Sequence, residues 1–413
     1  MSVEKRLDFL TDELAQLERL SQRRYLKTLA VLPDQQIEYQ GRKLVNFSGN
    51  DYLGLSQHQE VKDAAAAAIG SHGTSATSSR LVCGSLEPHE ELEKVLAEFK
   101  GREAALVFSS GYLTNLGLIA SLAGPDDVLF SDALNHASII DACRLSRAPV
   151  RVYRHNDLDH LGTLIRDTVT QGRRFILSDA VFSMDGDLAD LPGLYDLSVR
   201  HGCVLILDEA HSTGVLGQRG RGLAEHYRDL GDRREFEAEL VIEMGTLSKA
   251  LGSLGGFVCG PRVLRDYLIN KARTFIFSTG LPPSAVAAAL ASLKRVMDQP
   301  ELVATLRRNV THFATCLQKF GWPMKPPHVS AIVPVILGEP EKTLAVSRAL
   351  EERGFFVPAI RPPSVPPGTS RLRIAMSAGH SLHQIDSLSA ALGDLLGSGP
   401  LAPTAGTDRR STG

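Results

Sequence analysis

An acidic residue at the end of an apolar run is the first feature of this sequence that could do chemistry. In the segment LILDEAHSTG, Asp208 closes the run and His211 follows three positions later. An unpaired buried carboxylate is costly, so Asp208 needs a partner such as a cationic cofactor nitrogen or a metal ion. A nucleotide-hydrolysis site is a third reading, because Asp-Glu-Ala-His also occurs in one group of helicases. That site requires an upstream G-x-x-x-x-G-K-[ST] loop, and the chain contains no Gly-Lys dipeptide.

A lysine in a glycine-rich segment supplies the second element. In MGTLSKALGSLGG, Lys249 is preceded by Thr246 and Ser248. Their hydroxyl groups can bind phosphate oxygens together with backbone amides. An isolated lysine is most often a solvated loop residue, but Lys249 follows an apolar run just as Asp208 does. A Schiff-base lysine, with an aspartate on the ring nitrogen, is the arrangement that pyridoxal phosphate uses.

Three further motifs carry residues suited to the same cofactor. In SSGYLTN, Gly111 lets the backbone approach a phosphate at the start of a helix. In SDALNHASI, His136 can stack on an aromatic ring. In DAVFSMDGD, Ser183 can donate a hydrogen bond to a phenolate oxygen. Each motif is weak by itself, but together with Asp208 and Lys249 they favour a pyridoxal-phosphate site.

These residues follow short apolar runs that alternate with helical stretches, which predicts a mainly parallel α/β sheet. Ligands in such sheets bind beyond the carboxyl ends of the strands, where all five elements would lie. The predicted strands are Ala105–Phe108, Val128–Phe130, Val150–Tyr153, Phe175–Ser178, Val204–Leu207, Leu240–Glu243 and Gly256–Cys259.

The hydrophobic pattern of the sequence changes on either side of this region. The first 25 or so residues predict an amphipathic helix that packs on its own protein or on a partner subunit, with leucines at 7, 10, 14 and 17. After Pro282, a helix over Ala285–Met297 is followed by strands of a smaller α+β domain, in which Arg371 and Arg373 alternate as in a half-exposed strand. We therefore predict an N-terminal helix and arm (1–50), a large cofactor-binding domain (51–285), a small domain (286–397) and a disordered tail (398–413).

Composition excludes several classes of protein. The formal net charge of −2 gives no basic field for nucleic acid or anionic lipid. No segment approaches the roughly 20 apolar residues that span a bilayer, and the acidic N-terminus is unlike a signal peptide, so we expect a cytoplasmic protein. The five cysteines are far apart and form no C-x-x-C pair, so we expect free thiols and no metal site.

With these motifs assembled, the chain resembles the α-oxoamine synthases, a fold-type-I pyridoxal-phosphate family, from about residue 20 to residue 395. The resemblance implies a mainly parallel seven-stranded sheet with a smaller C-terminal α+β domain. The matching motifs are NFSGNDYLGL, SSRLVCGSLEPHEELE, SGYLTNLG, NHASIIDACRLS, VFSMDGD, DEAHSTGVLGQRGRG and GTLSKALG.

The resemblance also implies roles for individual residues. Lys249 would form the Schiff base and transfer the proton at Cα, and Asp208 would hold the ring nitrogen. Arg361 would bind the carboxylate of the amino acid. The other cofactor contacts would be Gly111, Tyr112, His136, Ser183, His211 and Thr246, with Ser278 and Thr279 supplied by the partner of a homodimer. The remaining substrate contacts would be Asn50, Ser364 and either Arg23 or Arg24.

The run Ile360-Arg361-Pro362-Pro363 is typical of the branch of this family that acts in biotin synthesis. It implies condensation of L-alanine with a pimeloyl thioester of coenzyme A or of an acyl-carrier protein. The alternatives are glycine or serine with another acyl thioester, an aminotransferase on the same fold, and a non-catalytic protein. The last of these is disfavoured because Lys249, Asp208 and His136 are all present.

Overall fold

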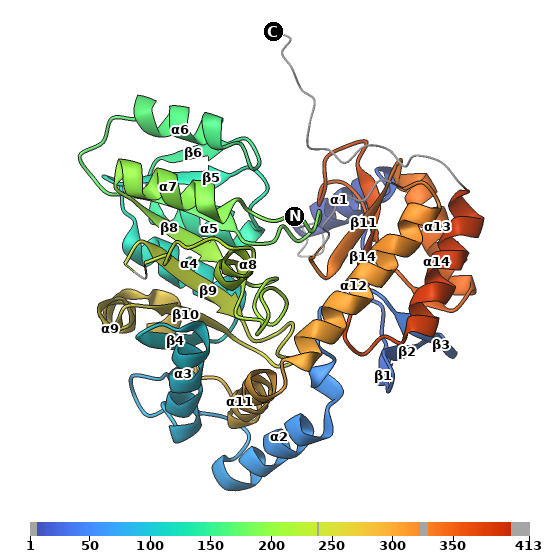
Figure 1. The fold of residues 1–413 in the computed structure, drawn as a ribbon, viewed down its shortest axis with the longest axis horizontal. Helices are drawn as coiled ribbons and strands as arrows, with labels where there is room; N and C mark the ends of the chain where they lie inside the picture. The colour runs from blue at the N-terminus through green and yellow to red at the C-terminus, as the bar shows by residue number, and fades with distance from the viewer. Residues whose placement is uncertain (1–5, 238, 323–328, 398–413) are drawn as a thin grey trace.

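The computed structural model describes residues 6–237, 239–322 and 329–397 (Figure 1). Its largest element is a seven-stranded sheet in the order β4-β10-β9-β8-β7-β5-β6. Strands β5 to β9 run parallel to one another, whereas β10 is antiparallel to both β4 and β9. The seven predicted strands and the mainly parallel sheet are thereby confirmed. The bounds are β4 Ala104–Phe108, β5 Val128–Asp132, β6 Val150–Tyr153, β7 Arg174–Asp179, β8 Cys203–Asp208, β9 Val241–Thr246 and β10 Gly256–Gly260.

Alternate residues of these strands point into two separate cores, one on each face of the sheet. In β8, Leu205 and Leu207 belong to one core and Ile206 to the other. This alternation follows from the two-residue period of a strand, and helices must cover both faces to bury it. The first face is covered by α3 Glu87–Lys100, α6 Leu158–Asp167 and α7 Leu191–His201, and the second by α4 Gly111–Leu122, α5 Ala137–Ser146 and α9 Arg262–Lys271.

The C-terminal part of the chain folds around a three-stranded antiparallel sheet in the order β11-β14-β13. A second small sheet joins the N-terminal strands to this part, because β12 pairs in parallel with β3. The strands are β1 Ala30–Leu32, β2 Gln36–Tyr39, β3 Arg42–Asn46, β11 Ile332–Gly338, β12 Phe355–Phe356, β13 Ala359–Ile360 and β14 Ser370–Ala375. The helices are α12 Glu301–Lys319, α13 Pro340–Glu352 and α14 Leu382–Leu396.

The predicted helix over Ala285–Met297 is confirmed as α11 (Pro283–Asp298), which packs against α2 (Gln59–His72) and α3. The predicted boundary between residues 285 and 286 therefore falls inside a helix. The predicted disordered tail at 398–413 lies outside the described residues. Two further short helices are α8 Leu223–Asp229 and α10 Arg273–Ile276.

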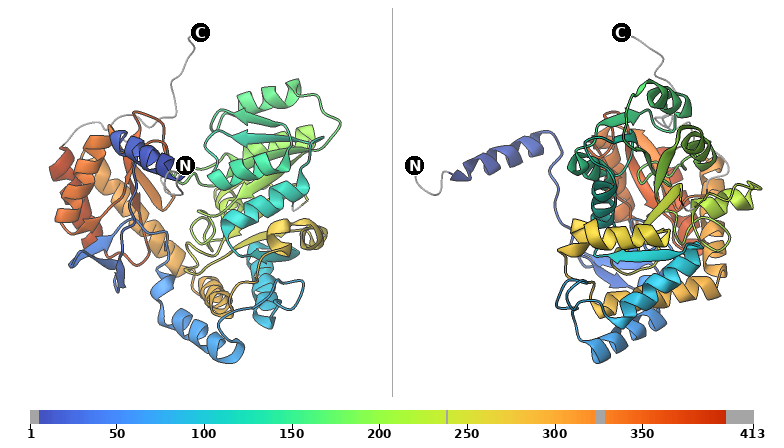
Figure 2. Two further views of the ribbon diagram at one scale, coloured as in Figure 1. Left: turned by 180° about the vertical axis from the view of Figure 1, so that it is seen from behind. Right: turned by 90° about the vertical axis from the view of Figure 1, so that its left-hand side faces the viewer.

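The N-terminal helix α1 (Asp8–Arg19) projects away from the rest of the chain (Figure 2). It buries no residue, and its leucines are exposed. The predicted helix is therefore confirmed, but none of the described residues covers its apolar side. Among the described residues, no helix combines the length and the apolar character needed to cross a membrane.

The predicted half-exposed alternation of Arg371 and Arg373 is wrong, because β14 is buried along its whole length. The side chains of Arg371 and Arg373 are buried because both find acceptors in the segment that follows β7. Arg371 bonds to Asp185 and to the carbonyl of Met184, and Arg373 bonds to the carbonyl of Ser183. Alternation of arginine with apolar residues thus reflects paired buried charges here, which are tolerated only with such partners.

One close backbone approach near the sheet edge generates a prediction. A Cβ on Gly256 would lie 2.7 Å from Gly111 Cα and 2.4 Å from Thr114 Oγ1. We expect Gly256→Ala to lower the free energy of unfolding by about 1–3 kcal/mol, as overpacking does. In Gly70→Ala the new Cβ would meet no atom within 4 Å, so this helical control should be neutral or slightly stabilising. Urea denaturation of both variants tests this, and equal stability of the two would contradict it.

Candidate active site

The carboxyl ends of the central strands bring the predicted catalytic residues to one edge of the large sheet. Asp208 ends β8, and the loop after β9 carries Lys249. His136 is the residue before helix α5, in the segment that follows β5. Gly111 begins α4 directly after β4, and Ser183 follows β7. Since these strands share a direction, their ends form one side of the molecule, where α/β sheets bind ligands.

A chain of hydrogen bonds connects Lys249 to the small domain. Lys249 Nζ lies 2.7 Å from His211 Nε2, and His211 Nδ1 lies 2.7 Å from the hydroxyl of Tyr52. Tyr52 in turn donates to Asn50 Oδ1 at 3.1 Å. The Asn50 amide oxygen also accepts from Arg373 Nη2 at 3.2 Å. Lys249 and Arg373 are therefore held in one network that crosses from the large domain to β14.

The electrostatic surroundings favour the neutral forms of Lys249 and His211. Burial lowers the pKa of Lys249 to about 8, although the carboxylates of Asp208 and Asp179 act in the opposite direction. The pKa of His211 lies well below its usual value, because the ring is buried and faces the positive charges of Lys249 and Arg373. A lysine that is partly neutral near pH 8 can act as a nucleophile and as a base, which an ordinary lysine cannot.

Asp208 is held by two donors at the centre of this edge. Its Oδ2 accepts from Asn115 Nδ2 at 2.7 Å, and its Oδ1 accepts from the amide of Ala210 at 2.9 Å. Asp179 is its partner in the register of the neighbouring strand. Burial and the charge of Asp208 raise the pKa of Asp179 well above its usual range. The pair therefore carries less than its full negative charge, and Asp208 is the carboxylate with the better-organised donors.

Hydrogen bonds hold the backbone and one ring nitrogen of His136, while its side chain remains exposed. Its backbone amide donates to Asp179 Oδ2 at 2.8 Å, and its Nδ1 lies 2.8 Å from Ser138 Oγ. Ser138 also accepts from Asn115, so the same asparagine orients Asp208 and the support of His136. The exposed imidazole is free to lie against a flat ligand.

Donor groups that suit an anion lie next to these residues, at the start of α4. The first amides of a helix have no acceptor within it, and they carry a partial positive charge. Next to them, a Cβ on Gly111 would lie 3.2 Å from Thr246 Cβ, so the backbone at Gly111 and the Thr246 hydroxyl border the same space. Thr246 Oγ1 bonds to Ser248 Oγ at 2.8 Å. Tyr112 is exposed and bonds through its hydroxyl to Asp141.

This donor set fits pyridoxal 5'-phosphate. The start of α4 and the hydroxyls of Thr246 and Ser248 suit its phosphate. Asp208 suits its ring nitrogen, His136 its ring face, and Lys249 its aldehyde.

Sequence reasoning missed two residues of this site, Arg373 and Tyr52. Arg373 is only 6% exposed, and its Nε donates to the Ser183 carbonyl at 2.6 Å. The hydrogen bonds of Arg373 use its Nε and Nη2 atoms, and no described residue accepts a hydrogen bond from its Nη1. The signal available in the sequence was the pair Arg371 and Arg373 in an otherwise apolar strand, which indicates partners within the protein.

The other predicted substrate residues lie together in a different place. Arg361 bonds to the carbonyl of Ser21, and Arg24 Nη2 bonds to Ser364 Oγ at 2.8 Å. With Arg23 they line a groove of about 770 Å³ between the segment after α1 and the β13 loop. The structure therefore gathers these four residues, Arg23, Arg24, Arg361 and Ser364, but forms no hydrogen bond between them and Lys249, Asp208 or Arg373 within the described chain.

Ser278 and Thr279 also lie apart from the Lys249 network. The Thr279 carbonyl accepts from Ser109 Oγ at 3.2 Å, and Thr279 pairs with Ser79 in an isolated bridge. Next to them Phe277 is 69% exposed, as is Val82 at 78%. Their predicted role, as cofactor contacts in a partner's active site, concerns an assembly of two chains and stays a prediction.

Sequence comparisons find relatives along nearly the whole chain. The aminotransferase class I and II family profile matches residues 42–392. An 8-amino-7-oxononanoate synthase of Anaeromyxobacter dehalogenans (strain 2CP-1) is 47% identical over 98% of both chains. The enzyme of that name from Geobacter sulfurreducens is 45% identical over 93% of this chain and 96% of its own.

Solved structures with a similar fold also cover most of the chain. A serine palmitoyltransferase from S. paucimobilis with a bound PLP–myriocin aldimine has a TM-score of 0.86 at 29% identity, covering 96% of this chain and 99% of its own. An 8-amino-7-oxononanoate synthase from Francisella tularensis has a TM-score of 0.72 at 28% identity, covering 85% and 97%.

The lowered pKa of Lys249 predicts how the cofactor-free protein recombines with pyridoxal phosphate. The neutral amine is the reactive form, so the recombination rate should rise with pH up to about 8 and level off above it. An unperturbed lysine would keep rising to about pH 10.4. Stopped-flow absorbance against pH measures this, with Lys249→Ala as the control that gives no such signal. A midpoint near pH 10 would refute the lowered pKa.

Proposed function

The chain belongs to the aminotransferase class I and II family, and we propose that it catalyses the reaction of the 8-amino-7-oxononanoate synthases. That reaction condenses L-alanine with a pimeloyl thioester and releases CO₂ and the free thiol, in biotin biosynthesis. Identities of 45–47% over nearly the whole chain support this choice. The observation that carries the chemistry is the hydrogen-bond network of Lys249. Lys249 has a lowered pKa and lies on the same edge of the large sheet as Asp208, and hydrogen bonds through His211 and Tyr52 connect it to Arg373 on β14.

The enzyme uses pyridoxal 5'-phosphate. When bound, this cofactor supplies an aldehyde that joins amino groups and a protonated ring that accepts the electron pair of the Cα–H bond. Asp208 would keep the ring nitrogen protonated, because a close negative charge favours the charged form of the ring. His136 would cover the ring face, and the start of α4 would hold the phosphate.

Lys249 is the group that moves the proton at Cα. Its amine is neutral often enough near pH 8 to remove that proton, and His211 holds it by a 2.7 Å hydrogen bond. The Cα of alanine would then attack the acyl carbonyl, the thiolate would leave and take a proton from solvent, and CO₂ would depart from the alanine carboxylate. Lys249 finally returns a proton to Cα, so it acts first as base and then as acid.

Arg373 is the best-placed group for the carboxylate of the amino acid. It is buried at the end of the network that begins at Lys249, and Nη1 faces no protein acceptor among the described residues. A buried guanidinium binds a carboxylate strongly, because both partners lose solvent. Arg361, which the sequence assigned to this task, lies instead in the groove with Arg23 and Arg24.

The groove suits the far carboxylate of the pimeloyl chain. Among the described residues, its basic lining is Arg23, Arg24, Lys27, Arg348 and Arg361, and its acidic lining is Glu18 and Glu351. This excess of positive charge attracts a dicarboxylic acyl group as pimeloyl-CoA or as pimeloyl-acyl-carrier protein. The exposed apolar residues beside Thr279 support a homodimer with shared active sites.

A second candidate is the condensation of serine or glycine with another acyl thioester. The higher TM-scores of the serine palmitoyltransferase structures, such as 0.86 against 0.72, favour it. The sequence identities favour the first candidate, at 47% against 29%. Side chains set substrate choice within one fold, so the identities carry more weight.

A substrate matrix tests the proposal. The cofactor-loaded protein is assayed for thiol release with alanine, glycine and serine, each against pimeloyl, acetyl, succinyl and palmitoyl thioesters. We expect the highest kcat/KM for alanine with pimeloyl, offered as the coenzyme A ester and on the carrier protein. A preference for serine with palmitoyl would select the second candidate and leave Lys249 and Asp208 in their roles.

Substitution of the two arginines separates their roles. We expect Arg373→Ala to lower kcat/KM for alanine by roughly 30- to 5,000-fold, which corresponds to about 2–5 kcal/mol for a buried charged partner. Arg373→Lys should recover only part of the lost kcat/KM, because lysine lacks the forked donors of the guanidinium group. Arg361→Ala should affect pimeloyl-CoA more than alanine.

Arg371→Ala is the matched control, since Arg371 is a buried arginine of the same strand that bonds only within the protein. It should leave the dissociation constant of alanine, measured from the cofactor absorbance, nearly unchanged. A larger loss of alanine binding in Arg361→Ala than in Arg373→Ala would return carboxylate binding to Arg361.

A further inference from the structure

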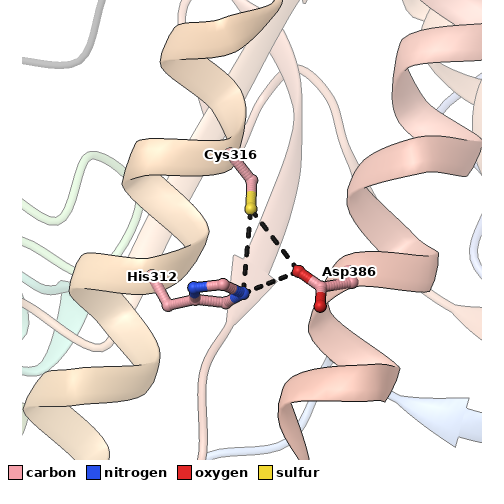
Figure 3. A group of neighbouring side chains, drawn as sticks. All are labelled: His312, Cys316 and Asp386. Carbon is pink, nitrogen blue, oxygen red and sulfur yellow. Dashed lines mark hydrogen bonds and ion pairs between the residues drawn. The ribbon is translucent and has the colours of Figure 1, made fainter.

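Three different metal-binding side chains converge on the outer side of the small domain (Figure 3). His312 and Cys316 lie one turn apart on α12, and Asp386 comes from α14. His312 Nε2 is 2.6 Å from Asp386 Oδ1. Cys316 Sγ lies 3.8 Å from His312 Nε2 and 3.7 Å from Asp386 Oδ1. The three atoms therefore form a triangle that one ion can face.

We propose that His312, Cys316 and Asp386 form a binding site for a zinc ion, separate from the active site. A thiol, an imidazole and a carboxylate are the three ligand types that Zn²⁺ accepts in proteins. The sulfur disfavours Mg²⁺ and Ca²⁺, which take oxygen ligands. No part of the proposed reaction uses these residues.

The distances between the ligand atoms agree with tetrahedral zinc. Bonds of about 2.3 Å to sulfur and 2.0–2.2 Å to nitrogen or oxygen place sulfur roughly 3.5–3.6 Å from the other two ligands. The two sulfur distances, 3.7 and 3.8 Å, are close to this. Only the 2.6 Å hydrogen bond between His312 and Asp386 must open, by about 0.7 Å, to reach the tetrahedral separation.

The exposure of the three side chains gives the site a buried base and an open mouth. Cys316 is buried, at 7% exposure, whereas the side chains of His312 and Asp386 are 33% and 56% exposed. The half-exposed Asp386 can rotate to open the hydrogen bond. Water takes the fourth position on the solvent side, as in zinc sites with three protein ligands. Lys319 is the opposing charge nearby, and the thiolate and carboxylate together balance the ion.

Bound zinc would tie the C-terminal half of α12 to the first turns of α14. These helices pack together, and α12 also holds the turn before α14 through Asn309, which donates to the carbonyls of Ser377 and His380 at 2.9 Å. An ion that binds the folded state alone stabilises it. Zinc should therefore raise the melting temperature of the small domain.

Calorimetric titration tests the site directly. The cofactor-loaded protein, freed of metal by chelator and gel filtration, is titrated with ZnCl₂. We expect one site per chain in the wild type, and affinity at least roughly 10-fold weaker in His312→Ala and in Cys316→Ser. Cys83→Ser is the matched control, because Cys83 is the exposed cysteine and the other four are buried. It should bind zinc as the wild type does.

Cobalt substitution identifies the ligand. Co²⁺ should give a thiolate charge-transfer band in the near ultraviolet in the wild type and in Cys83→Ser, but not in Cys316→Ser. Circular dichroism and cofactor absorbance show that the variants remain folded. The proposal fails if the wild type binds no zinc, or if His312→Ala and Cys316→Ser bind it as tightly as the wild type does. It also fails if the cobalt band is lost in Cys83→Ser and kept in Cys316→Ser. None of these measurements depends on turnover, so they are independent of the proposed reaction.

Discussion

The buried negative charge of Asp208 is the constraint on which the site depends. It lies at the end of β8, in the middle of the large sheet, where water cannot solvate it. Two donors, Asn115 and the Ala210 amide, orient it but do not neutralise it. A cation must therefore come to it, and the cofactor ring is that cation when bound. The same charge works against the lowering of the Lys249 pKa by burial.

Positive charge from the small domain balances the other side of the network. Arg373 reaches from β14 across the domain boundary to Ser183, Asn50 and Tyr52. Its charge helps keep His211 neutral, and neutral His211 can accept a hydrogen bond from Lys249. The base is therefore set by contributions from both domains, so a shift of the small domain would change the pKa of Lys249 and the carboxylate site together. The hydrophobic core also runs without interruption from one domain to the other.

Local patterns predicted the parts of the molecule that local patterns determine. Seven strands followed from short apolar runs, and Asp208, Lys249 and His136 followed from their positions after those runs. The proposed Zn²⁺ site could not be inferred from the sequence because Asp386 is 70 positions from Cys316, although the helical spacing of His312 and Cys316 was visible. Arg373 was missed for the same reason: its partners lie 190 and 323 positions away. The periodicity of a strand cannot distinguish exposure from burial with a distant partner.

The pairing of Asp179 with Asp208 shows why residue type alone does not assign a role. Both are buried aspartates that end neighbouring parallel strands, in register with each other. Two adjacent carboxylates cannot both ionise cheaply, so their donors decide which one carries the charge. Asp208 receives the Asn115 amide and a backbone amide, whereas among the described residues the side chain of Asp179 receives only the backbone amide of His136. Burial and the charge of Asp208 raise the pKa of Asp179, which positions His136, so we assign the cofactor contact to Asp208.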